Sequence, residues 1–125
     1  MSAILLVDDN PAVRNAVGDE LREAGYKVSE AASGSEALSL LERQPFDLLV
    51  VDYLLPEMKG DAIAHAARQC RPALRVVFLS GYTEFLSLTG KSGGDTLIAK
   101  PISSDELRRA VAEALQAPRS LAHAA

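Results

Sequence analysis

Short apolar runs alternate with longer amphipathic stretches along most of the chain. The runs predict five strands, at Ala3–Val7, Lys27–Ala31, Leu48–Asp52, Arg75–Ser80 and Thr96–Ala99. Because helix-like stretches separate the runs, crossover helices should join these strands into a parallel sheet. The third run is apolar up to its last residue, which is typical of a strand buried on both faces, whereas the more polar second run suits an edge. The pattern therefore predicts an α/β fold.

Helix boundaries carry local signals of their own. Asn10 can cap a helix that has Pro11 at its first position, and Gly25 can end that helix. The segment Ser33–Glu36 forms a capping box at the start of a second helix, which should end before Pro45. These signals place one helix before the second predicted strand in the sequence and another helix after it.

The later helices differ in regularity. One is expected over about Asp61–Cys70, with Cys70 on its apolar face as a buried structural thiol. Residues 83–95 begin like a helix but run into a glycine-rich stretch, so a fourth helix should be short or irregular. A second capping box, Ser103–Glu106, opens the last helix.

Length and composition restrict the class of protein. The chain has 125 residues, 48% of them hydrophobic, which is enough for one compact domain. We expect this domain over residues 1–117 and a flexible tail over 118–125. A net charge of −4 without a lysine- or arginine-rich cluster argues against direct DNA binding. No apolar stretch reaches the ~20 residues of a membrane span, and the single cysteine excludes an internal disulfide, so a cytoplasmic protein is expected.

Polar residues follow four of the predicted strands at their C-terminal ends. They are the pair Asp8-Asp9, then Asp52, Ser80 and Lys100. In a parallel sheet these ends lie at one edge, which is where open α/β sheets build their sites. The acidic pair could cap the following helix, but Asn10 is already a good cap. We favour a site for Mg²⁺ (or Mn²⁺) formed with Asp52, because carboxylates clustered in this way repel one another unless a cation lies among them.

The same residues indicate phosphoryl transfer. Asp52 could simply be solvated at its strand end, but as a nucleophile it would form an aspartyl-phosphate. Taken alone, Ser80 is an ordinary turn residue and Lys100 an ordinary surface charge. Beside the acids, the ammonium group would pair with phosphoryl oxygens and the hydroxyl would donate a hydrogen bond to one of them.

Two loops should shape this pocket. In the loop after the third strand, Pro56 restricts the backbone and Gly60 tolerates unusual backbone angles. The backbone carbonyl near Leu54 could complete the metal shell. Pro101 permits a cis peptide bond after Lys100, which would aim the lysine inward.

Taken in order, these residues resemble the receiver domain of two-component response regulators. The match spans about Ile4 to Leu115, and its pieces are Asp8-Asp9, the loop Asp52-x-x-Leu55-Pro56-x-Met58-x-Gly60, Ser80-Gly81 and Lys100-Pro101. The protein is expected to be either a single-domain regulator or a receiver similar to those of hybrid sensor histidine kinases, which the segment 78–84 resembles.

The resemblance implies a flavodoxin-like (βα)5 fold of three layers with strand order 2-1-3-4-5. It implies that Asp52 accepts a phosphoryl group from a histidine kinase or histidine phosphotransfer protein, followed by slow dephosphorylation. Asp9, Asp52 and the Leu54 carbonyl would hold Mg²⁺, and Asp8 would act mainly through a bound water. In this bacterial phosphorelay, a downstream protein would bind the face formed by the fourth helix, the fifth strand and the last helix.

Leu97 departs from the family pattern. Family members often carry an aromatic residue at this switch position, three residues before the lysine, so we expect an output different from the common form and a mobile segment at 83–95. Two alternatives stay open. One is a receiver-like interaction module that works without phosphorylation. The other is a flavodoxin-like cofactor binder, although the loop Asp8-Asp9-Asn10 would repel the phosphate of FMN.

Overall fold

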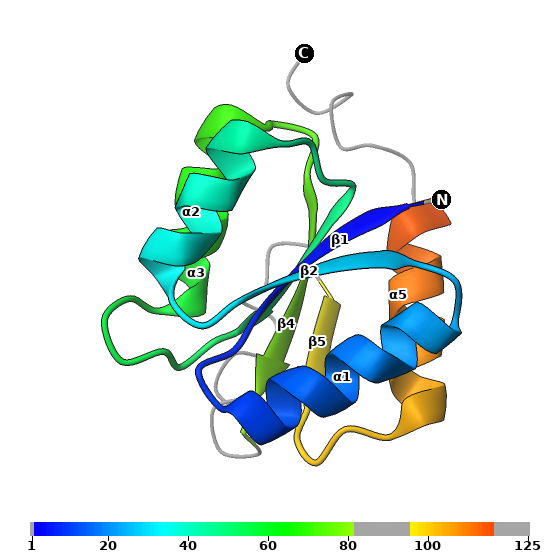
Figure 1. Cartoon of the computed structure of the whole chain (residues 1–125). Helices are drawn as coiled ribbons and strands as arrows, with labels where there is room; N and C mark the ends of the chain where they lie inside the picture. Colours follow the sequence, from blue (N-terminus) through cyan, green and yellow to red (C-terminus); the bar gives the residue numbers. More distant parts are fainter. Residues whose placement is uncertain (1, 82–95, 117–125) are drawn as a thin grey trace.

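A single parallel sheet forms the centre of the protein. The computed structural model describes residues 2–81 and 96–116, and its strands are ordered β2-β1-β3-β4-β5 (Figure 1). Their bounds are β1 Ala3–Val7, β2 Lys27–Ala31, β3 Leu48–Asp52, β4 Arg75–Ser80 and β5 Thr96–Ala99. The predicted strands are therefore confirmed, and the more polar β2 lies at an edge of the sheet as expected.

Helices cover both faces of this sheet. They are α1 Pro11–Glu23, α2 Gly34–Arg43, α3 Gly60–Cys70 and α5 Ser104–Gln116. The pair α1 and α5 lies on one face, and the pair α2 and α3 lies on the other (Figure 1). Alternate residues of β1 enter the two cores, since Leu5 packs with residues of α2 and α3 whereas Leu6 packs with residues of α1 and α5. The structure thus has the three layers expected of a flavodoxin-like fold.

The predicted helix signals agree with the observed helix ends. The Asn10 side chain caps α1, with its oxygen accepting a hydrogen bond from the Ala12 amide at 2.9 Å. Gly25, just after α1, has a φ of 99°, which lies in the left-handed region that favours glycine. The Ser33 hydroxyl accepts a hydrogen bond from the Glu36 amide at 3.2 Å, and an equivalent bond opens α5. These ends are set by nearby residues and are therefore readable from the sequence.

One expectation about α3 is wrong, because Cys70 is exposed rather than buried. The buried stripe of α3 includes Ile63, Ala64 and Ala67. Cys70 lies seven residues after Ile63 and so falls on the same side of the helix, but it is the last residue of α3 and is left exposed at the helix end. The expected fourth helix at 83–95 and the expected tail at 118–125 lie outside the described residues.

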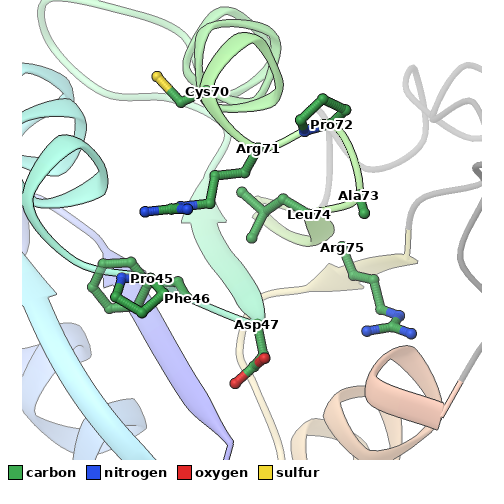
Figure 2. Close-up of a pocket in the computed structure, with 9 residues that line it drawn as sticks. All are labelled: Pro45, Phe46, Asp47, Cys70, Arg71, Pro72, Ala73, Leu74 and Arg75. Carbon is green, nitrogen blue, oxygen red and sulfur yellow. The ribbon is translucent and has the colours of Figure 1, made fainter.

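A hollow of about 360 Å³ lies at the amino ends of β3 and β4, opposite the edge where the polar residues gather (Figure 2). Arg71 reaches across its rim, and its Nη2 atom donates to the carbonyl oxygens of Leu41 and Gln44 at 3.3 and 3.1 Å. The side chain thereby ties the end of α3 to the end of α2. None of the predicted site residues lines this hollow.

Candidate functional site

Three carboxylates meet at the carboxyl edge of the sheet. Asp8 follows β1 and Asp52 ends β3, and these two strands are hydrogen-bonded neighbours in which Val7 pairs with Val51. One carboxylate oxygen from each of Asp8, Asp9 and Asp52 lies within 4.8 Å of the other two. Asp8 and Asp52 are buried whereas Asp9 is exposed, so the cluster opens to solvent on the side of Asp9. The predicted convergence of the acids is present in the structure.

Lys100 reaches the same point from β5, two strands away from β3. Its Nζ atom lies 3.2 Å from an Oδ2 atom of Asp8 and 3.2 Å from an Oδ2 atom of Asp52. The lysine side chain is 26% exposed, so both ion pairs are partly shielded from water. A single ammonium group therefore bridges two carboxylates from different strands.

The charges of this group do not balance. Burial raises the pKa of Asp52, and Asp8 raises it further, while Lys100 and the Leu54 amide only partly oppose the effect. Burial by itself would lower the pKa of Lys100, but the carboxylates of Asp52 and Asp8 outweigh it and raise that pKa. The pKa of Asp52 is thus raised mainly by burial, whereas the pKa of Lys100 is raised by the two carboxylates that share it. A divalent cation would offset the remaining negative charge, and the all-oxygen donor set suits a hard ion such as Mg²⁺.

Asp8 is held in place at each of its polar groups. Its amide donates to the carbonyl oxygen of Ala31 in β2 at 3.2 Å, and its Oδ1 atom accepts from the Asn10 amide at 2.9 Å. Its carbonyl oxygen accepts a hydrogen bond from Nη1 of Arg14 at 2.7 Å. Our sequence analysis missed Arg14. The available signal was a cation at the fourth residue of α1, near a helix end whose dipole disfavours positive charge.

Gly60 brings α3 close to the backbone of Asp52. A Cβ atom at this position would lie 2.7 Å from the Asp52 carbonyl oxygen and 2.8 Å from Cα of Tyr53. The Gly60 amide also donates to the Tyr53 carbonyl oxygen at 2.7 Å. We expected Gly60 to be needed for unusual backbone angles, but its φ is not positive. Glycine is needed here because a side chain would collide with the backbone of Asp52 and Tyr53.

The rest of this loop lies at the surface beside the acids. The Leu54 amide donates to Oδ1 of Asp52 at 3.3 Å, and the Leu54 side chain is 46% exposed. Pro56 is exposed as well, whereas Leu55 is buried and anchors the loop in the core.

Two predicted residues lie on the strands beyond β3. Ser80 is buried at the end of β4, but its hydroxyl donates to the Gly81 carbonyl oxygen at 3.2 Å rather than to a carboxylate. Leu97 is half-buried in β5, where it pairs with Phe78 and packs against the core formed with α2 and α3. The Lys100–Pro101 peptide bond is cis, as the sequence permitted.

The fold and this acidic site together define a receiver domain. The chain matches the family model of the response regulator receiver domain over residues 4–112, and it belongs to that family. The expected domain limit at residue 117 stays a prediction. Of the helices in the described part of the chain, none has the length and apolar character to cross a membrane.

Several known bacterial proteins are similar to this chain. The sensor kinase CckA of Brucella abortus (strain 2308) is 36% identical over 92% of this chain and 13% of its own length. CpdR, a response regulator receiver protein of the same organism, is 35% identical over 66% of this chain and 68% of its own. The crystal structure of the response regulator TrrA of Thermotoga maritima, in complex with Mg²⁺-BeF, is 30% identical with a TM-score of 0.81, covering 90% of this chain and 98% of that one. This chain spans less than half the length of several of its curated relatives.

Proposed function

We propose that this receiver domain is a phosphoacceptor switch in which Asp52 takes a phosphoryl group from the phosphohistidine of a histidine kinase or phosphotransfer protein. The observation that carries the proposal is the bridge of Lys100 to both Asp8 and Asp52, beside an exposed Asp9. This arrangement places a buried nucleophile, a fixed cation and an unbalanced negative charge at one point of the surface. A purely structural ion pair would need only one acid for one lysine.

The acids are suited to hold Mg²⁺ in this proposal. Asp9 and Asp52 would be direct ligands together with the Leu54 carbonyl, and Mn²⁺ could substitute because it favours the same oxygen donors. Asp8 would act mainly through a bound water, since its side chain is fully buried whereas Asp9 is exposed. The bound ion would neutralise the charge between the acids and the incoming phosphoryl group.

In the transfer step, a carboxylate oxygen of Asp52 forms a bond to phosphorus as the bond from phosphorus to the donor imidazole nitrogen breaks. The electron pair of that bond stays on the imidazole, which is left neutral or takes up a proton. Lys100 would exchange its contact with Asp52 for one with a phosphoryl oxygen. Attack of water on the acyl phosphate would release inorganic phosphate, return the Asp52 carboxylate and reset the switch.

Output would follow from the residues on β4 and β5. The Ser80 hydroxyl would leave the Gly81 carbonyl and donate to a phosphoryl oxygen, and this movement would alter the packing beside Leu97. We infer that a downstream protein binds the face that includes β5 and α5. Because Leu97 has no ring to turn inward, the change at this face should be smaller than in receivers with an aromatic residue there.

Two alternative functions have less support from the site. A receiver-like module that binds partners without phosphorylation would not need a buried acid beside a lysine, yet both are present. A flavodoxin-like cofactor binder would need a loop after β1 that accepts phosphate, whereas this loop holds Asp8 and Asp9. A colourless purified protein would count further against the second.

The test is incubation of the protein with acetyl phosphate and Mg²⁺, followed by intact-mass measurement. We expect a gain of one phosphoryl group that is absent without Mg²⁺ and absent in Asp52→Asn. Asp19→Asn is the matched control, since it removes an exposed carboxylate on α1 and should be labelled like the parent. Labelling of Asp52→Asn to the level of the parent would refute Asp52 as the acceptor, and an unlabelled parent would favour the phosphorylation-independent module.

A further inference from the structure

Arg14 connects the acidic site to a second group of charges on α1 and β2. Its Nη1 atom donates to the Asp8 carbonyl oxygen at 2.7 Å while its Nε atom lies 3.3 Å from Oε1 of Glu30. The Arg14 side chain is only 19% exposed, so both contacts are partly shielded from water. An arginine makes two such contacts at once because its donors have a fixed planar arrangement. The side chain therefore joins β2 to the turn that carries the acids.

Glu30 is itself held from two sides. Its second carboxylate oxygen, Oε2, lies 2.8 Å from Nη2 of Arg22, which is about two helical turns further along α1 than Arg14. Gly18 leaves room for this carboxylate, since a Cβ atom there would lie 2.9 Å from Oε2. The anchor at the far end of the Arg14 bridge is thus fixed by packing and by a second arginine.

We propose that Arg14 is a positioning residue for the metal site, and that the bridge from Glu30 through Arg14 to the Asp8 carbonyl sets the orientation of the turn bearing Asp8 and Asp9. Asp9 is exposed, and none of the other described residues hydrogen-bonds or pairs with its carboxylate. The placement of Asp9 therefore depends on the backbone that precedes it. This inference rests on the proposed Mg²⁺ site.

Positioning and simple charge predict opposite results. Arg14 is a cation close to a site for a cation, so its charge alone weakens Mg²⁺ binding, and its removal would strengthen that binding. If Arg14 instead holds the turn in place, its removal weakens binding, because ligands lose affinity when their supporting hydrogen bonds are lost. The direction of the change in affinity separates the two explanations.

The experiment measures Mg²⁺ affinity by isothermal titration calorimetry on the unphosphorylated protein, with thermal unfolding in EDTA as a check on folding. We expect Arg14→Gln to weaken Mg²⁺ binding on the order of 10-fold. Arg108→Gln is the matched control, since it also removes an arginine that pairs with a glutamate of α1 but touches neither Glu30 nor Asp8, and its affinity should stay at the parent value or rise slightly. Labelling by acetyl phosphate in Arg14→Gln should be slower at limiting Mg²⁺ and recover to the parent rate at saturating Mg²⁺.

Arg14→Lys keeps the test decisive if the glutamine variant does not fold. It preserves the charge, but one ammonium group cannot reproduce the two-ended bridge, so weaker binding of Mg²⁺ can arise only from lost positioning. Unchanged or tighter binding in a folded Arg14 variant would overturn the inference while leaving the proposed function intact. Failure of the parent protein to bind Mg²⁺ would instead overturn the proposed site, and the inference with it.

Discussion

At the scale of single residues, the site is an unbalanced group of charges. Asp8 and Asp52 are both buried, and the ammonium group of Lys100 lies between them. Buried charges that lack full compensation oppose folding, and the raised pKa of Asp52 expresses this cost. The excess negative charge lowers the stability of the metal-free protein. The same charge makes the site suitable for a divalent ion, which is proposed to assist the binding of a phosphoryl group.

This cost predicts that Asp52→Asn stabilises the metal-free protein at neutral pH. The pKa of Asp52 in the folded state lies above its ordinary value of 3.8, so the contribution of this group to stability is fully present below that value and is lost as the pH rises through the folded pKa. A neutral amide avoids the loss. The free energy of unfolding by urea in EDTA should therefore be higher for Asp52→Asn than for the parent at about pH 7, and the difference should shrink toward about pH 3.5.

Asp19→Asn again provides the comparison, because its carboxylate is exposed and its effect should stay within about 0.5 kcal/mol at either pH. An Asp52→Asn variant less stable than the parent at neutral pH would show that the ion pair with Lys100 outweighs burial.

At the scale of elements, the junction of β3 and α3 brings a helix against the backbone of Asp52, the proposed acceptor. The first residue of α3 is Gly60, and its amide bonds the Tyr53 carbonyl while the Asp52 carbonyl lies in the space that a side chain would need. The Tyr53 hydroxyl also donates to Asp61 at 3.3 Å, and its ring contacts Phe78 edge-on at 6.1 Å. The loop between the two elements is therefore closed by contacts at its own ends.

Gly60→Ala should disturb both stability and labelling. The new methyl group would meet backbone atoms at 2.7 and 2.8 Å, which cannot move aside as the end of a side chain can. We expect a loss of about 1–3 kcal/mol in the free energy of unfolding and slower labelling of Asp52 by acetyl phosphate.

Gly34→Ala is a useful control for this effect. It adds the same methyl group at another buried helix start, but its nearest neighbours are the side-chain ends of Ile63 and Met58 at 3.1 to 3.2 Å. It should cost less stability and leave labelling unchanged. Equal losses in the two variants would mean that close approach to the Asp52 backbone has no special role.

At the scale of the whole molecule, the sheet brings together groups that are remote in the chain. Asp8 and Lys100 are 92 residues apart, yet the strands before them end at the same edge. A ligand bound at this edge holds β1, β3 and β5 together and should stabilise the entire domain, because the unfolded chain has no such cluster.

Mg²⁺ should therefore raise the free energy of unfolding in a concentration-dependent way, by about 2.7 kcal/mol when the free ion is at 100 times its dissociation constant. Urea unfolding across a Mg²⁺ series measures this effect. In EDTA, Asp9→Asn should be at least as stable as the parent, since the carboxylate makes no hydrogen bond or ion pair with the described residues and its removal relieves repulsion among the acids. It should lose most of the Mg²⁺ effect. An undiminished Mg²⁺ effect in Asp9→Asn would place the ion elsewhere.

Much of the fold was readable because its signals are local. The alternation of apolar runs with amphipathic stretches located the strands, and caps such as Asn10 and Ser33 marked the helix starts, since each depends on residues a few positions away. The acids and the lysine were also predictable, because a residue that follows a strand in a parallel sheet has only one edge to occupy.

Other features depended on how distant elements pack. No local pattern predicts that Lys100 bonds both acids at the same distance or that Arg14 reaches the Asp8 carbonyl. Nor does any predict that Gly60 is needed for close approach rather than for its backbone angles. The exposure of Cys70 has the same origin, since helical spacing identifies a face but not where the neighbouring element ends. The order of residues determined the elements and the edge where the site forms, while tertiary structure decided which side chains touch, because contacts depend on distances that the chain closes only when it folds.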